Sequence, residues 1–239
     1  MNKIIIISGD PNSINSEIIY KSWKIINKSL KNKIYVISNY RLLKNQFKKL
    51  KYPITLNIVK NINEKGSVNS LNILNIDLKF KNPFNVQKIH ASKFVIQSLN
   101  YAHKLAQNKE ISGIINCPIN KTLFIKEKIG VTEFLANKCK VRDNSEVMLI
   151  RNKKLSVCPV TTHINVKEIS KKIKSEIIIK KINTIQSWFK RKFKKKPKIA
   201  ILGLNPHNAE LRKNSEEVKI IIPSISKLKK KGINIKGPL

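Results

Sequence analysis

Two histidines stand where an α/β protein is expected to bind a ligand. His163 follows the apolar segment 155–160, and His207 follows the apolar segment 198–202. If both segments are strands, each imidazole lies just beyond the carboxyl end of a strand, where open α/β sheets gather ligand-binding groups. Neutral imidazole is a good ligand for a divalent transition metal. The residues alone leave a second interpretation open, in which each histidine is a loop residue hydrogen-bonded to the backbone.

A polar loop after another apolar segment offers groups that suit an anion. It follows residues 113–117 and carries the amide of Asn120, the amine of Lys121 and the hydroxyl of Thr122. An anionic substrate would match this set, and a solvated lysine after a strand explains it equally well. The seven glycines form neither a GxGxxG nor a GxxxxGK[ST] pattern, so the usual Rossmann fingerprint and a P-loop are unsupported.

The elements that position these residues alternate between strand and helix, which predicts an α/β protein with a largely parallel sheet. Residues 61–83 are too irregular for a prediction. In the long helix expected at 86–107, the apolar face is expected to consist of Ile89, Ile96, Leu99, His103 and Ala106. The expected strands are 3–7, 34–37, 54–59, a buried one at 113–117, and 198–202, with a hairpin formed by 146–150 and 155–160. The first expected helix begins near residue 16. Further helices are expected at 40–50, 86–107, 132–139, 166–194 and 215–230, and Thr132 is the expected N-cap of the helix at 132–139.

The composition narrows the classes of partner. The chain has 239 residues and a net charge of +35, but only 5 of its 49 basic residues are arginine, and 28 residues are asparagine. Arginine is favoured for recognition of bases and phosphates, so an AT-rich genome explains this bias better than a nucleic-acid surface does. No apolar run approaches the roughly 20 residues that span a bilayer. We therefore expect a cytoplasmic protein with no specific nucleic-acid partner, no membrane contact, and three buried, unbridged cysteines.

Six segments, in order, resemble one enzyme family. They are Ile7-Ser8-Gly9-Asp10-Pro11, Asn116-Cys117-Pro118-Ile119-Asn120-Lys121, Gly130-Val131-Thr132-Glu133-Phe134-Leu135-Ala136, Thr161-Thr162-His163-Ile164, Gly203-Leu204-Asn205-Pro206-His207 and Gly237-Pro238-Leu239. Together they are similar to the motifs of the 4-hydroxythreonine-4-phosphate dehydrogenases. The resemblance covers essentially the whole chain.

The resemblance implies a fold like that of the isocitrate and isopropylmalate dehydrogenases, with two α/β domains, an interdomain cleft and a homodimeric assembly. We expect an N-terminal α/β domain at 1–120 and an incomplete second α/β domain at 121–239 that carries the metal and substrate motifs. The fold binds NAD without a GxGxxG pattern. His163 and His207 would be two of three histidine ligands of a divalent metal (Zn, Co or Mg). Thr132 would contact the substrate beside Val131, which stands where the family has a histidine, and Lys121 is a further candidate for phosphate or carboxylate.

The implied reaction is NAD-dependent oxidation and decarboxylation of 4-phosphooxy-L-threonine to 3-amino-2-oxopropyl phosphate in pyridoxal 5'-phosphate biosynthesis. The sequence ends inside a family motif, so the activity of this chain is expected to be impaired, because two histidines and water hold a metal poorly. Two alternatives stay open. One is a dehydrogenase of a related four-carbon phosphorylated hydroxy acid, and the other is a decayed, non-catalytic protein that binds polyanions.

Overall fold

The chain packs as two compact units. The computed structural model describes residues 3–124, 130–141, 145–162, 164–205, 207 and 212–239. The first unit spans Met1–Lys138 and the second spans Cys139–Leu239. Each unit has a hydrophobic core of its own. These units are defined by the contacts within the chain and do not test the domain boundary expected after residue 120, which stays a prediction.

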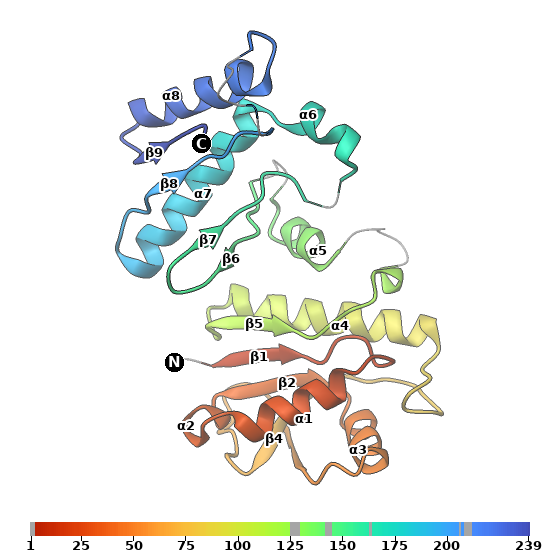
Figure 1. Ribbon diagram of the computed structural model, residues 1–239. Helices are drawn as coiled ribbons and strands as arrows, with labels where there is room; N and C mark the ends of the chain where they lie inside the picture. The colour runs from red at the N-terminus through yellow and green to blue at the C-terminus, as the bar shows by residue number, and fades with distance from the viewer. Residues whose placement is uncertain (1–2, 125–129, 142–144, 163, 206, 208–211) are drawn as a thin grey trace. The chain divides into compact units, whose positions relative to one another are not determined.

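The first unit is built on a five-stranded sheet in which every strand runs parallel to its neighbours (Figure 1). The strand order is β3-β4-β2-β1-β5, so β5 lies on the opposite side of β1 from β2. The strands are β1 (Ile4–Ile7), β2 (Ile34–Ser38), β3 (Thr55–Val59), β4 (Ser70–Asn75) and β5 (Gly113–Asn116). The helices are α1 (Asn15–Ile25), α2 (Lys28–Lys31), α3 (Tyr40–Lys49), α4 (Lys88–Gln107), η1 (Lys121–Leu123) and α5 (Val131–Lys138).

Helices cover both faces of this sheet, which explains why its central strands are almost continuously apolar. Successive side chains of a strand point to opposite faces. In β2, Tyr35 and Ile37 therefore join the core that includes α4, whereas Ile34 and Val36 join the core that includes α1 and α3. The predicted α/β class with a parallel sheet is confirmed.

Helix α3 shows how the sequence sets a helix start. The side-chain oxygen of Asn39 accepts a hydrogen bond of 2.9 Å from the N–H of Leu42 and so caps the first turn. Leu43 and Phe47, four residues apart, are both buried on the face that meets the sheet. The observed helix differs from the prediction only at its last residue.

Strand β4 lies within residues 61–83, for which no secondary structure was predicted. Leu71 and Ile73 are buried in it, but so is Asn72, at 0% exposure. The side-chain oxygen of Asn72 accepts a 2.8 Å hydrogen bond from the N–H of Ser67, and its amide nitrogen donates one of 3.1 Å to the Ser67 carbonyl. A buried amide with partners is tolerated, so an asparagine-rich segment forms an interior strand.

The predicted buried face of the long helix is wrong. Ile89 is 69% exposed and Ala106 is exposed, while Ile96 and His103 are half-buried. Of the predicted face only Leu99 is fully buried. The buried apolar side chains recur every three or four residues, as expected for one helical face, and are Ala91, Phe94, Val95, Leu99, Ala102 and Leu105. The prediction took Ile89 as part of the buried face, and this placed the face at the wrong angle around the helix axis.

Strand β5 exists where it was predicted, but it is not buried. It pairs with β1 and ends the strand order of the first sheet. Ile115 is 54% exposed, whereas Cys117, one residue beyond the strand, is 6% exposed. Apolar composition predicts a strand but does not distinguish an interior strand from an edge strand, and that accounts for the error.

The second unit combines two short sheets with two longer helices (Figure 1). Strands β6 (Ile150–Arg151) and β7 (Ser156–Val157) are antiparallel, and β8 (Ile199–Ala200) and β9 (Ile235–Lys236) are parallel. The helical segments are η2 (Val166–Glu168), α6 (Ile169–Lys172), α7 (Ser175–Phe193), the π-helical turn η4 (Glu217–Ile221) and α8 (Ile222–Lys230). The antiparallel pairing of β6 with β7 confirms the predicted hairpin in shorter form. In its turn the side-chain oxygen of Asn152 accepts a hydrogen bond of 2.8 Å from the N–H of Lys154.

The helix predicted over 166–194 is interrupted. Residue Ile173, with a ψ of 118°, is extended and ends α6, and Lys174 is extended as well. Ile173 is only 8% exposed and belongs to the isoleucine-rich core of the second unit. Burial of this side chain therefore accompanies a break that the apolar periodicity did not reveal.

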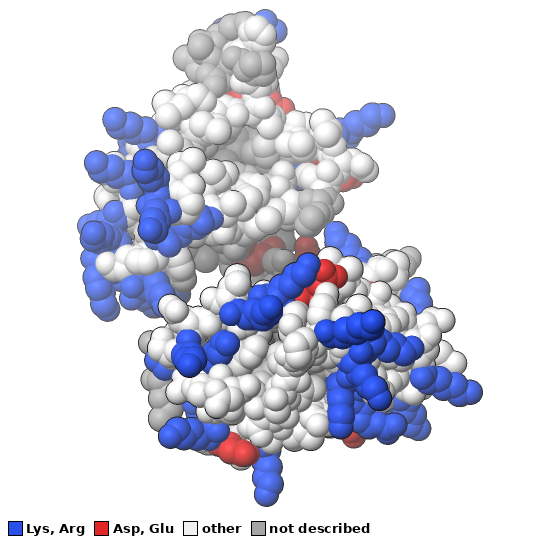
Figure 2. All heavy atoms as spheres, turned by 60° about the horizontal axis from the view of Figure 1, so that its bottom comes forward, with Lys and Arg blue, Asp and Glu red and all other residues white. Residues whose placement is uncertain are grey.

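Basic side chains are spread widely over the surface. Figure 2 shows Lys and Arg over both units on the face toward the viewer, with few acidic side chains among them. In the part of the chain that the structure describes, no helix is both long and apolar enough to cross a membrane.

Candidate active site

The loops that follow β1 and β5 form the candidate site of the first unit. The two strands are parallel neighbours, so both loops leave the sheet at the carboxyl ends of the strands. The chain builds β2 on one side of β1 and β5 on the other, so the strand order reverses here. In open α/β sheets, ligands bind outside the carboxyl ends of the strands at such a reversal. The fold therefore brings the loop at Ser8–Pro11 together with the loop that carries Lys121.

The side chain of Asn15 ties these two loops together. Its amide nitrogen donates to the carbonyls of Ser8 and Pro118, both at 2.8 Å, and approaches that of Asp10 at 3.2 Å. Gly9 lies under this contact with a φ of 72°, and a Cβ there would lie 2.6 Å from the Pro118 carbonyl oxygen. Only glycine accepts both the backbone conformation and the close approach. The two loops are thus held in one arrangement.

Lys121 is exposed at the end of the β5 loop. It begins η1, whose first turn is capped by the side chain of Asn120, which accepts the N–H of Thr122 at 3.0 Å. The far end of η1 is fastened to α4, because the hydroxyl of Ser92 donates to the Leu123 carbonyl. The loop is therefore fixed at both ends while the lysine stays open to solvent, as contact with an anion requires.

Helix α5 carries the two other predicted substrate residues. The helix begins at Val131, so Thr132 is its second residue and not the predicted N-cap. Instead, the carboxylate of Glu133 accepts the N–H of Gly130 at 3.0 Å. Thr132 is exposed, whereas Val131 is half-buried and packs against the core of the first unit. The threonine can contact a substrate, and the valine contributes an apolar side chain.

The predicted metal ligands belong to the second unit. His163 lies outside the described residues. His207 is exposed in the loop after β8, and its backbone N–H donates a hydrogen bond of 3.1 Å to the side-chain oxygen of Asn205. Among the described residues, no three His, Cys, Asp or Glu side chains come together in a way that could hold a metal. The donor type still suits the group, since imidazole is a good ligand for a divalent transition metal.

Comparison with known proteins shows the family. The family model described as pyridoxal phosphate biosynthetic protein PdxA matches residues 11–239. The chain belongs to this family. It is 35% identical over 249 residues to the 4-hydroxythreonine-4-phosphate dehydrogenase of Sulfurihydrogenibium sp., covering 100% of this chain and 74% of the relative. It is 37% identical over 248 residues to the enzyme of that name from Aquifex aeolicus, with the same coverage of each chain.

A solved structure of the PdxA family confirms the fold class. The crystal structure of 4-hydroxythreonine-4-phosphate dehydrogenase from Klebsiella pneumoniae superposes with a TM-score of 0.88 at 26% identity. The match covers 100% of this chain and 75% of that chain. The fold of this PdxA chain is therefore that of the isocitrate and isopropylmalate dehydrogenases, as predicted.

The cysteines of this PdxA chain are unbridged, but they are not all buried as expected. Cys117 is buried, Cys158 is half-buried and Cys139 is exposed. Burial raises the pKa of the Cys117 thiol to about 11. A thiol with such a pKa is almost entirely protonated at neutral pH and is a poor nucleophile. Cys117 therefore serves the start of the β5 loop as a small apolar residue.

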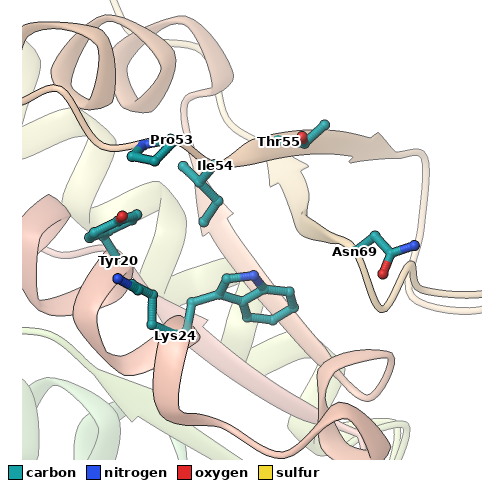
Figure 3. Close-up of a pocket in the computed structure, with 7 residues that line it drawn as sticks. Tyr20, Lys24, Pro53, Ile54, Thr55 and Asn69 are labelled. Atoms are coloured by element: carbon teal, nitrogen blue, oxygen red, sulfur yellow. The ribbon is translucent and has the colours of Figure 1, made fainter.

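A hollow of about 380 Å³ lies at the amino ends of strands β3 and β4 of the first sheet. Figure 3 shows Thr55 and Asn69 on one side of it, at the amino ends of β3 and β4, and the Lys24 side chain next to Tyr20 on the other. The rings of Tyr20 and Trp23 that line it are almost fully buried. This hollow lies away from the carboxyl ends of the strands, so it is not the candidate active site.

Two polar residues that organise the predicted site were missed by sequence analysis. Asn15 bridges the loops of the first unit, and the carboxylate of Glu217 holds the start of the His207 loop, accepting the N–H of Leu204 at 2.7 Å. A signal for Asn15 was its position at the start of a helix that follows Gly9 and Asp10. Glu217 gave no such signal, because its partner lies 13 residues earlier in the chain.

Proposed function

We propose that this protein oxidises 4-phosphooxy-L-threonine with NAD, and that the product loses carbon dioxide to give 3-amino-2-oxopropyl phosphate in pyridoxal 5'-phosphate biosynthesis. The observation that carries the proposal is the family match over residues 11–239, together with relatives named 4-hydroxythreonine-4-phosphate dehydrogenase that align with 100% of this chain. These comparisons do not favour the alternative of a non-catalytic polyanion-binding protein, nor that of a dehydrogenase for a different substrate.

The exposed groups of the first unit supply the substrate contacts in this proposal. The Lys121 amine, on a loop fixed at both ends, attracts the phosphate or the carboxylate of the substrate. Thr132 offers a hydroxyl from the first turn of α5. Val131 excludes water from its side of the substrate without accepting or donating a hydrogen bond. Such contacts orient the substrate, which is the main contribution of a protein to cofactor-dependent chemistry.

His163 and His207 would hold a divalent metal such as zinc, cobalt or magnesium. When bound, the metal supplies Lewis-acid stabilisation of the negative charge that develops on the substrate oxygen. During the oxidation a hydride leaves C3 for NAD and the C3 hydroxyl loses its proton. In the resulting β-keto acid the bond between C2 and the carboxylate then breaks, carbon dioxide leaves, and the enolate takes up a proton at C2 to give the product. A homodimer in the cytoplasm belongs to the same proposal, supported by the resemblance to the family.

A comparison of substrates tests this function. The protein is incubated with NAD and Co²⁺ or Zn²⁺, and NADH formation is followed with 4-phosphooxy-L-threonine, with unphosphorylated 4-hydroxy-L-threonine, and with a phosphorylated four-carbon hydroxy acid that lacks the amino group. We expect the first substrate to be used at least about 100-fold better than either of the others, because loss of a bound charged group costs a few kcal/mol.

The readout of this assay is a ratio of rates, so it does not depend on the absolute rate of the preparation. The control variant Lys93→Ala removes an exposed lysine of α4 that is not part of the candidate site, and it should leave the ratio unchanged. Equal use of the acid that lacks the amino group would reject 4-phosphooxy-L-threonine as the substrate.

A further inference from the structure

The second unit contains a buried acidic side chain at the start of its last long helix. Glu217 is 0% exposed and lies in the π-helical turn η4, directly before α8. A buried carboxylate is costly unless donors meet its charge. Its environment therefore indicates what the residue does.

Leu204 and Asn205, in the loop after β8, donate hydrogen bonds to Glu217. One carboxylate oxygen accepts the N–H of Leu204 at 2.7 Å and the N–H of Asn205 at 3.4 Å. The side-chain amide of Asn205 approaches both carboxylate oxygens, at 3.3 and 3.4 Å. Burial alone raises the pKa of Glu217, but hydrogen bonds from the N–H groups of Glu217 itself, Leu204 and Asn205 and from the Ser215 side chain lower it below its ordinary value. The side chain is therefore ionised at neutral pH and holds this loop by charge-assisted hydrogen bonds.

The contact continues from Glu217 to His207. Because the amide nitrogen of Asn205 is turned toward the carboxylate, its side-chain oxygen faces the other way and can act only as an acceptor. That oxygen accepts the N–H of His207 at 3.1 Å. A chain of hydrogen bonds thus runs from the buried carboxylate through one amide to the backbone of the histidine.

The start of this chain is anchored in the core of the second unit. Ile221, in the same π-helical turn as Glu217, is 3% exposed and packs with Ile225 and Leu228. Leu204, at the other end of the first hydrogen bond, packs against the same cluster. Pro223 lacks an N–H and cannot complete a regular turn, which is consistent with the wider turn at its N-terminal side.

We propose that Glu217 is a positioning residue, which through Asn205 sets the conformation of the loop that presents His207 to the metal. The inference rests on the proposed role of His207 as a ligand. A ligand side chain on a loop has to be held close to its productive geometry. Residues behind metal ligands typically change metal affinity by about 10–100-fold when they are replaced.

The first test measures the loop without any metal. Glu217→Gln keeps the size of the side chain but places an amide donor against the donors of Leu204 and Asn205. We expect faster hydrogen exchange at the amides of both Leu204 and His207. Asn205→Ala should speed exchange at His207 and leave Leu204 protected, because it breaks only the second step of the chain. Glu216→Gln, which removes the neighbouring half-buried charge, is the matched control and should change neither amide.

The second test measures the binding of Co²⁺ by isothermal titration to the same variants. Glu217→Gln is expected to weaken binding by about 10-fold or more, whereas Glu216→Gln leaves it at the wild-type value. Circular dichroism verifies that each variant is folded, and Glu217→Asp, which retains the charge, should restore part of the affinity if Glu217→Gln unfolds the unit.

The two tests separate this inference from the proposed function. Unchanged exchange at Leu204 and His207 in Glu217→Gln overturns the positioning role whatever the metal data show. Faster exchange with unchanged Co²⁺ affinity also overturns it, because the loop then does not govern the metal. If His207→Ala binds Co²⁺ as the wild type does, the assignment of His207 fails, and the exchange data still report on the loop.

Discussion

Replacing Gly9 by alanine is expected to lower the free energy of unfolding of the first unit by about 2–4 kcal/mol. Two costs add up at this position. The φ of 72° is unfavourable for any residue with a Cβ, and that Cβ would lie 2.6 Å from the Pro118 oxygen and 2.7 Å from the amide nitrogen of Asn15. Because the Pro118 carbonyl belongs to the β5 loop, relief of the clash also displaces the loop of Lys121.

The measurement for Gly9→Ala is urea unfolding followed by the fluorescence of Trp23, which is buried in the first unit. A Trp188→Phe background leaves Trp23 as the single reporter. Gly232→Ala is the matched control, since Gly232 shares the φ of 72° but has no described heavy atom within 4 Å of its Cβ position. Gly232 lies in the second unit, so the unfolding of this variant is followed by the fluorescence of Trp188 in a Trp23→Phe background. That control should cost only about 1–2 kcal/mol. Equal losses at the two positions would show that the contact with Pro118 is not tight.

Replacing Phe94 by alanine is expected to lower the free energy of unfolding of the first unit by about 3–5 kcal/mol. Phe94 is 1% exposed and packs in the core between α4 and the sheet, with β1 and β2 residues in the same cluster. Removing the ring forfeits its burial and leaves a cavity that the surrounding strands can fill only in part. The same urea experiment measures the loss.

Phe84→Ala makes a matched control for Phe94→Ala. Phe84 is 37% exposed, so the same chemical change removes less buried surface and should cost about 1 kcal/mol or less. Similar losses for the two variants would contradict the placement of the core on the Phe94 side of the helix.

The sequence predicts the existence of elements well where one signal dominates. The isoleucine run of β1 and the capped start of α3 were both placed within a residue or two. Strong β propensity in the first case and an Asn39 cap in the second are local signals. They do not require knowledge of the rest of the fold.

The remaining features depend on contacts between distant segments. Strand β4 could not be predicted because the burial of Asn72 depends on partners supplied by Ser67 and by strand β2. The exposed edge at Ile115 and the extended break at Ile173 follow from neighbours that periodicity does not reveal. Local pattern therefore gave the class of element more reliably than its place in the core.

The candidate site divides in the same way. Thr132 was named from the family resemblance and Lys121 mainly from its charge and its place in a loop, and the structure places both on exposed surface of the first unit. Asn15 and Glu217, which hold the loops, were missed because the contacts with the Pro118 carbonyl and with the Leu204 N–H form only in the folded chain. The type of a residue indicates that it can bind a substrate or a metal, whereas its role in positioning a loop can be recognised only in the folded chain.

The most direct test of the whole account asks whether His163 and His207 share one cation. Co²⁺ is titrated into the wild type, His163→Ala, His207→Ala, the double variant and His90→Ala, a control in α4. We predict that either single replacement weakens Co²⁺ binding strongly, that the double variant loses little more, and that His90→Ala binds as the wild type does. Wild-type affinity in His163→Ala or in His207→Ala would contradict the shared site and the proposed chemistry with it.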